Sequence, residues 1–336
     1  MQRLVKLNTN ESPYGPSPKA LAAIEAQTND DLRLYPDPEG LALKEVIANL
    51  HGLDPKQVFL GNGSDEVLAH IFMGLFKQNK PIQFPDITYS FYPVYCKLFG
   101  IEYKTIPLAD DFSIRTSDFT TPNGGIIFPN PNAPTGRPLP RAEIEALISK
   151  NPDSVVVIDE AYVDYGTPSC IPLLKGANCP ENVLVVHTLS KSRALAGLRV
   201  GFALGHPSLI AGLERVKNSF NSYPLGRLAQ VGAIAAIQDQ AHLEMSSAKV
   251  MQTRANLVGE LSKLGFDTLP STANFILTQH SKQSGAELYQ ALRDRGIIVR
   301  HFKLARIENF LRITIGTDEQ CAELTTTLKE ILSKLE

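Results

Sequence analysis

The sequence predicts an α/β protein with a large domain built on a mainly parallel, mixed sheet and a small α+β domain after it. Short apolar runs rich in Val, Ile and Phe recur up to about residue 205, and helix-like segments separate them. Strands that are apolar on both faces are typical of parallel sheets covered by helices. After about residue 245 the pattern changes to a long amphipathic helix followed by alternating strands and helices, which indicates the second domain.

Length and composition allow this division. The chain has 336 residues, of which 43% are hydrophobic, enough for one large and one small core. We expect an extended N-terminal arm with a small-domain segment over 1–30, a large domain over 31–245 and a small α+β domain over 246–336. The stretch LNTNESPYGPSP, residues 7–18, predicts the arm because Pro, Asn and Ser disfavour regular structure.

Strands and helices are predicted to alternate along the chain. The predicted strands of the large domain are QVFLGNG (57–63), KPIQFP (80–85), EYKTIPL (102–108), GGIIFPN (124–130), SVVVIDE (154–160), VLVVHTLS (183–190) and LRVGFALG (198–205). Apolar residues at helical spacing predict intervening helices over 64–76 and 141–150. In the small domain we expect, after the long helix, a strand over 273–279, a helix over 284–296, strands over 296–302 and 309–316, and a final helix.

Charge and cysteine content limit the classes of molecule that the protein is expected to bind. The formal net charge of -2 gives no broad electrostatic reason to bind nucleic acid or an anionic membrane. No apolar run is long enough for a transmembrane helix, and the first residues lack the apolar core of a signal peptide. The four cysteines are scattered and the histidines are dispersed. We therefore expect reduced thiols, no metal site and a cytoplasmic protein that acts on small molecules.

The motif GNGSDE, residues 61–66, follows a strand and opens a helix. Its glycines let the backbone approach an anion, and the free N–H groups at the helix start attract one, so a phosphate would fit. The motif lacks the third glycine of a dinucleotide-binding loop and the lysine of a Walker loop, which disfavours NAD and ATP. In the alternative interpretation, Ser64 or Asp65 only caps the helix.

Two further strands end in polar side chains. Asp159 closes the buried run SVVVIDE, and Tyr162 follows three residues later. In a functional interpretation, the carboxylate of Asp159 needs a cationic partner. In the alternative interpretation, Asp159 only caps the following turn. The segment NPNAPTG, residues 130–136, is a rigid turn that either aims amide side chains at a ligand or is only a turn.

A lysine follows the most apolar strand. The run VLVVHTLS is followed directly by Lys191, with Arg199 eight residues further on. For a single lysine at a sheet edge, an ion pair with an acid is the default interpretation. Because all four motifs lie at strand ends, however, we expect them to meet in one cleft. Pyridoxal phosphate needs all four: an amine for a Schiff base, a carboxylate on its pyridinium nitrogen, donors to its phenolic oxygen and a phosphate cradle.

The order GNGSDE, NPNAPTG, DEAYVDY and TLSKSRALAGLRVGF resembles the fold-type I, pyridoxal-phosphate-dependent aminotransferases. LNTNESPYGPSP, RLYPDPEG, SFNSYPLGRLAQ and NFLRITIGT are similar to the histidinol-phosphate aminotransferases among them. The resemblance spans nearly the whole chain. It implies the fold-type I architecture, the cofactor pyridoxal 5'-phosphate, and a homodimer that moves an amino group between histidinol phosphate and 2-oxoglutarate, giving glutamate, in histidine synthesis.

The resemblance also implies roles for residues of this sequence. Lys191 would form the Schiff base and move the proton, Asp159 would hold the pyridinium nitrogen, and Tyr162 would hold the phenolic oxygen. Contacts to the phosphate and ring would come from Ser64, Asp65, Tyr89, Thr188, Ser190 and Arg199, with Tyr35 reaching the cofactor phosphate of the neighbouring subunit. Substrate would be bound by Tyr14, Arg300 and Arg312.

Two positions depart from the family pattern. The family turn commonly has asparagine directly before PTG, where this chain has Ala133, so Asn132 is expected to take over the contact with the phenolic oxygen. The segment after the lysine reads SKSR, which places Arg193 where the family has an aromatic residue.

Other functions stay open. An aromatic amino acid aminotransferase and a phosphothreonine decarboxylase would share the fold, and Arg300 and Arg312 could be surface arginines rather than an anion site. A non-catalytic ligand sensor is disfavoured because the chain keeps Lys191 and carries no appended helix-turn-helix or basic arm.

Overall fold

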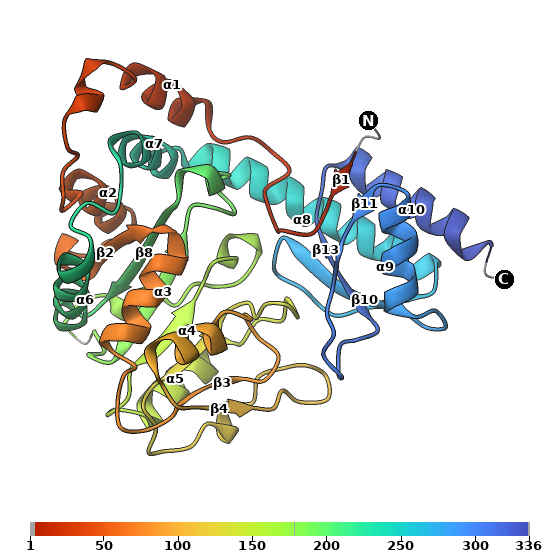
Figure 1. Ribbon diagram of the computed structural model, residues 1–336, viewed down its shortest axis with the longest axis horizontal. Helices are drawn as coiled ribbons and strands as arrows, with labels where there is room; N and C mark the ends of the chain where they lie inside the picture. Colours follow the sequence, from red (N-terminus) through yellow and green to blue (C-terminus); the bar gives the residue numbers. More distant parts are fainter. Residues whose placement is uncertain (1–3, 178, 335–336) are drawn as a thin grey trace.

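The computed structural model describes residues 4–177 and 179–334. Figure 1 shows a larger part built on the central sheet beside a smaller part that carries the C-terminal helix. Helix α8 (Gln240–Lys263) runs from the larger part along the smaller one. Within the described ranges, none of the helices combines the length and the apolar composition that crossing a membrane requires.

Seven strands of the described chain form the central sheet, in the order β2-β8-β7-β6-β5-β3-β4. Neighbours pair in parallel except β8, which is antiparallel to both β2 and β7. The strands are β2 (Val58–Asn62), β3 (Ile82–Pro85), β4 (Tyr103–Ile106), β5 (Ile126–Pro129), β6 (Val156–Asp159), β7 (Val183–Thr188) and β8 (Val200–Gly205). Each lies within one of the predicted runs, so the predicted mixed, mainly parallel sheet is confirmed.

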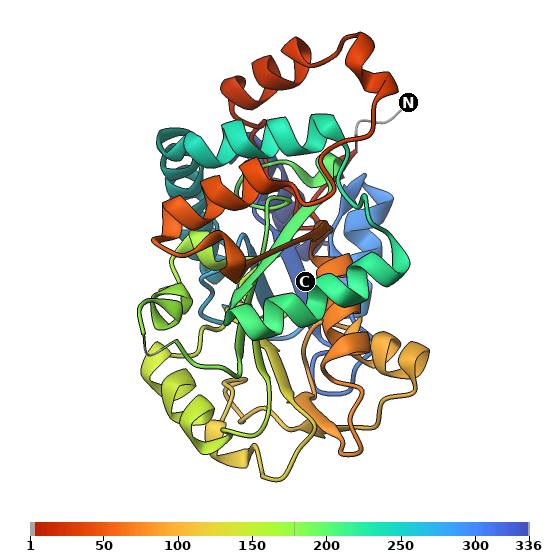
Figure 2. The ribbon, with the colours of Figure 1, turned by 90° about the vertical axis from the view of Figure 1, so that its left-hand side faces the viewer.

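Both faces of this sheet are covered, as Figure 2 shows. Successive residues of β6 alternate between two cores: Val156 packs with the core under α2, α5 and α7, and Val157 with the core under α3, α4 and α6. This two-sided burial is the reason why the strands read as continuous apolar runs. The helices are α1 (Pro18–Ala26), α2 (Leu41–His51), α3 (Gly63–Gly74), α4 (Tyr92–Phe99), α5 (Arg141–Lys150), α6 (Pro207–Phe220) and α7 (Arg227–Gln238).

Short 3-10 helices lie in the connections of the described chain: η1 (Asp30–Arg33), η2 (Pro55–Gln57), η3 (Thr116–Asp118), η4 (Val163–Tyr165), η5 (Ile171–Leu174) and η6 (Ala196–Leu198). The smaller part has an antiparallel sheet in the order β12-β13-β10-β9. Its elements are β9 (Phe266–Thr268), β10 (Phe275–His280), α9 (Gly285–Asp294), β11 (Ile297–Ile298), β12 (Arg300–His301), β13 (Phe310–Thr314) and α10 (Asp318–Leu332). Helix α10 begins with a capping box in which Thr317 and Gln320 bond to each other's backbone N–H.

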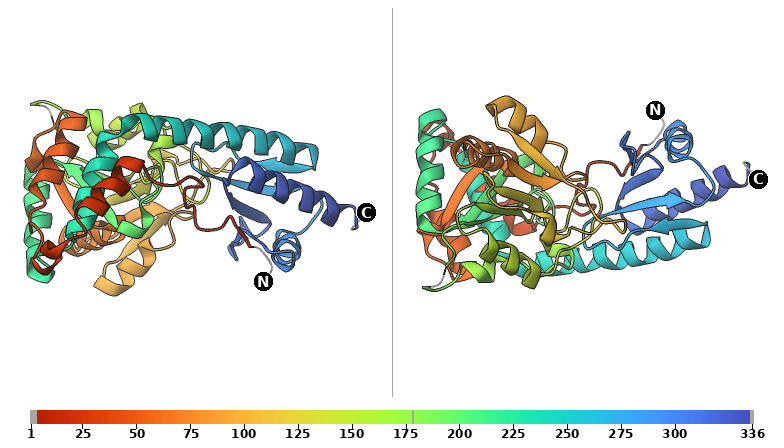
Figure 3. Two further views of the ribbon diagram at one scale, coloured as in Figure 1. Left: turned by 90° about the horizontal axis from the view of Figure 1, so that it is seen from above. Right: turned by 90° about the horizontal axis from the view of Figure 1, so that it is seen from below.

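The prediction of one strand over 296–302 was wrong. The segment forms two short strands, because β11 pairs in parallel with the N-terminal strand β1 (Val5–Lys6) whereas β12 pairs with β13. The arm therefore starts on the smaller part and then runs back between the two parts toward α1 (Figure 3). Residues 7–16 contain no helix or strand. The predicted boundary at residue 245 falls inside α8, and the three-segment division remains a prediction.

Candidate active site

A cavity of about 130 Å³ lies where the carboxyl ends of β5, β6 and β7 face the start of α3. Strand ends leave backbone and side chains free of the ladder, so polar groups can converge there. Most of the residues expected at the cofactor meet in this cavity. Its lining is Ser64, Asp65, Tyr89, Pro129, Ala133, Asp159, Ala161, Tyr162, Thr188, Ser190, Lys191 and Arg199.

The amine of Lys191 projects into this cavity from the loop after β7. The Leu189 N–H donates to the Val200 carbonyl, which holds the start of the loop against β8. Nζ of Lys191 donates to the Thr9 carbonyl at 3.3 Å and lies 5.7 Å from the ring centroid of Tyr162. No carboxylate of the described residues forms an ion pair with it. Such an amine, held by a neutral carbonyl, can act as a nucleophile or base once it loses its proton.

Asp159 ends β6 and is only 6% exposed. Burial raises the pKa of this carboxyl group to about 6. Two hydrogen bonds to the carboxylate partly oppose this rise: the Ala161 N–H donates to Oδ1, and the Tyr92 hydroxyl donates to Oδ2 at 3.3 Å. The group lacks a cationic partner among the described residues. A buried acid of this kind can hold a cationic group of a ligand and keep it protonated.

The start of α3 offers an anion site. No side chain caps the helix at Asn62, and Ser64 and Asp65 of its first turn line the cavity. The free N–H groups of a helix start can bind an anion. Gly63 has φ +77°, and a Cβ atom there would collide with the guanidinium of Arg199. Glycine is thus required for Arg199 to cross the helix start. Nη2 of Arg199 pairs with Asp65 Oδ2 at 2.9 Å, and an anion would compete for this arginine.

Tyr89 and the β7 loop complete the lining. The hydroxyl of Tyr89 donates to Asp65 Oδ1 at 2.9 Å, which fixes the ring at the cavity wall. Burial and the nearby Asp65 carboxylate raise the pKa of Tyr89, so the phenol stays protonated. Thr188 Oγ1 accepts from the Ser190 N–H at 3.1 Å and donates to Ser190 Oγ at 3.0 Å.

The structure turns Asn132 away from the cavity. Its Nδ2 donates to the Ile87 carbonyl at 2.9 Å and to Thr135 Oγ1 at 3.1 Å, while its Oδ1 accepts from Thr88 Oγ1 at 3.0 Å. These buried groups need partners, and Asn132 is fully engaged in supplying them. Ala133 lines the cavity in its place. Asn132 therefore does not line the cavity, and its contact with the phenolic oxygen remains a prediction.

Arg300 and Arg312 face each other across β12 and β13, outside the cavity lining. The guanidinium of Arg312 lies 5.4 Å from the ring centroid of Phe275 and 5.6 Å from that of Phe302, and Nη2 donates to the Asn8 carbonyl at 2.7 Å. Its buried Nε has no partner among the described residues. Burial lowers the pKa of Arg312. A half-satisfied, buried guanidinium is suited to an anion such as a phosphate or carboxylate.

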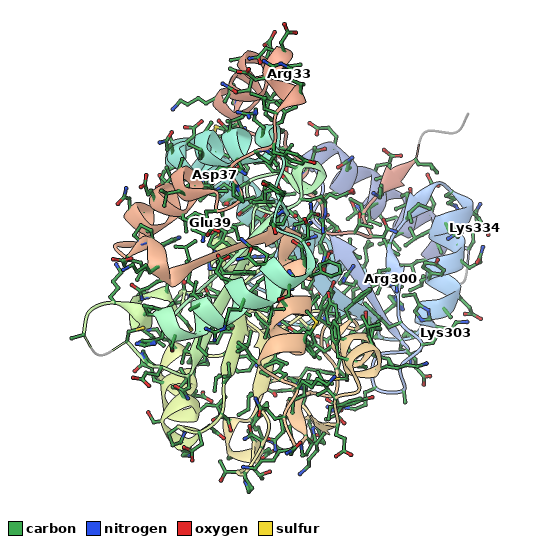
Figure 4. The ribbon with its side chains drawn as sticks, turned by 60° about the vertical axis from the view of Figure 1, so that its left-hand side comes forward. Arg33, Asp37, Glu39, Arg300, Lys303 and Lys334 are labelled. Carbon is green, nitrogen blue, oxygen red and sulfur yellow. The ribbon has the colours of Figure 1, made fainter. Side chains whose placement is uncertain are left out.

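Arg300, labelled in Figure 4, is exposed. Its guanidinium lies 5.5 Å from the ring centroid of Phe302. Tyr14 lies against α8, where Lys249 Nζ is 5.3 Å from its ring centroid, and does not line the cavity. Arg193 is buried, with Nη1 donating to the Ala236 carbonyl, so it faces neither solvent nor the cavity.

Tyr35 is not brought to the cavity of its own chain. Its side chain is 80% exposed and stacks on Tyr223 with centroids 4.8 Å apart. Side chains of α6 and α7 donate to three backbone carbonyls of the segment 35–38. From α7, Arg227 donates to the Tyr35 carbonyl at 3.2 Å and Gln230 to the Asp37 carbonyl at 3.0 Å. From α6, Lys217 donates to the Pro38 carbonyl at 3.3 Å. Figure 4 labels Asp37 in this segment and Glu39 just after it.

The chain matches a known protein family over almost its whole length. The family model "Aminotransferase class I and II" matches residues 2–328. The chain belongs to this family. It is 62% identical to histidinol-phosphate aminotransferase 2 of Dechloromonas aromatica, over 98% of this chain and 92% of that relative. It is 60% identical to histidinol-phosphate aminotransferase 1 of Methylococcus capsulatus, over 99% and 92%.

A solved aminotransferase has the same fold. The crystal structure of histidinol-phosphate aminotransferase from Sinorhizobium meliloti in complex with pyridoxal-5'-phosphate matches with a TM-score of 0.88 and 26% identity, covering 98% of this chain and 91% of that one. The fold-type I architecture and the family expected from the sequence motifs are therefore confirmed.

Sequence reasoning missed three residues that contact the site of this aminotransferase. Tyr92 donates to Asp159, Thr9 accepts from Lys191, and Asn10 Nδ2 donates to the Tyr162 hydroxyl at 3.0 Å. Tyr92 lies three residues after Tyr89 at the start of α4, and this spacing is a signal that could have indicated it. The arm residues carried no such signal, because nothing in their local pattern indicates which surface they cross.

Proposed function

We propose that this aminotransferase uses pyridoxal 5'-phosphate to move an amino group between histidinol phosphate and 2-oxoglutarate, in the synthesis of histidine. The observation that carries the proposal is the meeting of three groups in one cavity: the amine of Lys191, the buried acid Asp159 and the uncapped start of α3. The relatives at 60–62% identity that bear the name histidinol-phosphate aminotransferase support the choice of substrate.

The residues present fit the cofactor. The uncapped start of α3 suits the phosphate, and so does Gly63, where the Cβ atom of any other residue would block Arg199. Ser190 and Thr188 line the same cavity. Asp159 would hold the ring nitrogen, since its buried carboxyl group lacks a cation. The hydroxyl of Tyr162 would meet the phenolic oxygen, and the ring of Tyr89 would stack on the pyridine.

When bound, pyridoxal phosphate supplies an electron-accepting ring that makes the proton on the substrate's amino-bearing carbon acidic. Asp159 would keep the ring nitrogen charged, because its carboxylate in this buried position gains from a cationic neighbour. Lys191 would hold the cofactor through its amine and, once released, that amine would serve as the acid–base group for the proton on the substrate's amino-bearing carbon. Both side chains line the same cavity.

Arg312 would bind the substrate's anion. Histidinol phosphate carries its only anion on the phosphate, whereas 2-oxoglutarate presents carboxylates, so both partners would use the same guanidinium in turn. The free Nε and the two aromatic rings around Arg312 support this role, and Arg300 opposite it adds a second positive charge. Tyr14 would border the same site from the arm.

The active unit would be a homodimer in the cytoplasm. An 80% exposed tyrosine on a firmly held segment supports the proposal that Tyr35 reaches the cofactor phosphate of the neighbouring subunit. The free cysteines support a reducing compartment. The near-neutral net charge of -2 speaks against nucleic acid or membrane partners.

A panel of amino donors with 2-oxoglutarate as acceptor tests the function. Histidinol phosphate should be the best donor, followed at a distance by free histidinol. If phenylalanine or tyrosine is faster, the protein is an aromatic aminotransferase; if phosphothreonine releases carbon dioxide without transamination, it is a decarboxylase. A colourless protein that takes up no pyridoxal phosphate would indicate a non-catalytic sensor.

A further inference from the structure

The N-terminal arm meets two residues of the candidate site at successive positions. The Thr9 carbonyl accepts from Lys191 Nζ at 3.3 Å, and the side chain of Asn10 donates from Nδ2 to the Tyr162 hydroxyl at 3.0 Å. These contacts join residues more than 150 positions apart in the chain. The arm therefore contacts both reacting side chains, and among its described residues Asn10 is the one whose side chain bonds to Tyr162.

Asn10 is held in one orientation. It is 1% exposed, and its φ of +56° lies in the left-handed region, which asparagine tolerates better than most residues. Its N–H donates to Thr314 Oγ1 at 3.0 Å, its Oδ1 accepts from the same hydroxyl at 2.9 Å, and its carbonyl accepts from Asn274 Nδ2 at 3.0 Å. Because Thr314 engages Oδ1, the amide presents only an N–H to Tyr162.

This orientation decides what Tyr162 can do. A phenol oxygen that accepts from an amide N–H keeps its own proton for another acceptor. Within the described residues no hydrogen bond uses that proton, and Tyr162 lines the cavity. We propose that Asn10 is a positioning residue that makes Tyr162 a hydrogen-bond donor into the cavity. The inference rests on the proposed function, in which Tyr162 meets the phenolic oxygen of the cofactor.

The role has a spectroscopic consequence. A donor on the phenolic oxygen stabilises its deprotonated form, and so lowers the pKa of the proton that the bound cofactor shares with Lys191. That proton determines the absorbance of the bound cofactor. If Asn10 no longer holds the Tyr162 oxygen, the hydroxyl can turn elsewhere, and the midpoint of a spectrophotometric pH titration should rise. A residue that only packs the arm would leave this midpoint unchanged.

Four variants of the holoenzyme separate the two roles. Asn10→Gly removes the amide but keeps the left-handed backbone accessible. Thr314→Ser is the matched control: it loses only a buried methyl group, and its hydroxyl can still bond to the Asn10 side chain and backbone and hold the amide beside Tyr162. Tyr162→Phe removes the acceptor, and the double variant Asn10→Gly/Tyr162→Phe tests whether Asn10 acts through Tyr162. Each is titrated spectrophotometrically with pyridoxal phosphate bound, and its melting temperature is recorded.

We expect Asn10→Gly to raise the midpoint by about half to one pH unit, in the same direction as Tyr162→Phe. In the Tyr162→Phe background the Asn10→Gly change should add almost nothing, and Thr314→Ser alone should lower the melting temperature without moving the midpoint. An Asn10→Gly shift that persists in the Tyr162→Phe background, or a Thr314→Ser shift of equal size, would overturn the inference.

Two further results keep the test decisive. If Asn10→Gly does not fold, Asn10→Ser replaces it, because the shorter side chain can still bond Thr314 but cannot reach Tyr162, and the same shift is expected. If Tyr162→Phe moves the midpoint and Asn10→Ser does not, the inference about Asn10 is wrong while the proposed function stands. Failure of the wild-type protein to bind pyridoxal phosphate would instead remove the proposed function.

Discussion

The amine of Lys191 lies 5.7 Å from the ring centroid of Tyr162, although the two residues follow different strands, β7 and β6. These strands are neighbours and run in parallel, so their carboxyl ends bring the amine and the phenol to the same edge of the sheet. The nucleophilic amine of Lys191 and the hydroxyl of Tyr162 can therefore act on one bound ligand, as the proposed transamination requires.

Replacing Lys191 by alanine should abolish transamination while the protein still binds pyridoxal phosphate through α3 and Arg199. A loss of at least about 10⁴-fold is expected, because the nucleophile and the proton carrier disappear together. In the wild type, borohydride should attach the cofactor to the peptide that contains Lys191. Lys150→Ala, at the exposed end of α5, is the control, and a label on any other lysine would show that the assignment of Lys191 is wrong.

Asp159→Asn should leave the fold intact and slow turnover by roughly two to four orders of magnitude, because a neutral amide cannot keep the cofactor's ring nitrogen charged. Steady-state kinetics and circular dichroism on the same preparation check this. Asp153→Asn, which changes an exposed carboxylate outside the cavity lining, is the matched control. Turnover near that of the wild type would remove Asp159 from the site.

The same substitution should stabilise the protein once the cofactor has been removed. The pKa of Asp159 is about 6 in the folded chain against an ordinary 3.8, so between these values the folded state holds a proton that the unfolded state has lost. Stability contributed by this group is therefore present below pH 3.8 and falls as the pH rises through 6. Asp159→Asn should gain about 2–3 kcal/mol at neutral pH, and calorimetry should show the gain vanishing near pH 4. When both proteins are saturated with pyridoxal phosphate, the wild type should instead be more stable than Asp159→Asn.

Arg312→Ala should weaken both half-reactions, since both substrates lose their anion anchor. Removal of a charge-assisted bond in a desolvated site should cost about 2–4 kcal/mol, or roughly 30- to 1000-fold in kcat/KM. The discrimination between histidinol phosphate and free histidinol should shrink at the same time. Arg293→Ala, on the exposed side of α9, should change neither quantity; an unchanged preference in Arg312→Ala would contradict the anion role.

Mixing inactive chains tests the role of Tyr35. A Tyr35→Ala chain keeps Lys191, and a Lys191→Ala chain keeps Tyr35, so a mixed dimer would have one complete site if Tyr35 acts across the interface. Refolding the two together should restore roughly a quarter of wild-type activity, because half of the dimers are mixed and each has one complete site of two. No recovery is expected if Tyr35 serves its own subunit.

Features that depend on local rules were the ones best predicted from the sequence. Asp159 and Lys191 were identifiable because an apolar run ending in a polar side chain places that side chain at the edge of a sheet. The orientation of the Asn132 side chain could not be predicted, since it depends on hydrogen bonds to the Ile87 carbonyl and the Thr88 hydroxyl, more than 40 positions away. The role of Asn10 could not be predicted for the same reason, because its partner Thr314 lies 304 positions further along the chain. Such choices depend on tertiary contacts that no local pattern records.

The segment from Tyr35 to Pro38 has one more consequence, for the kinetics of assembly. Three donors from α6 and α7 already hold its backbone within a single chain. The torsional entropy of this segment is therefore lost when the monomer folds, and docking onto a second surface freezes little more than the tyrosine side chain. If the proposed homodimer forms through this segment, its association should resemble the collision of preformed bodies, with a rate limited by diffusion and orientation rather than by a slow ordering step.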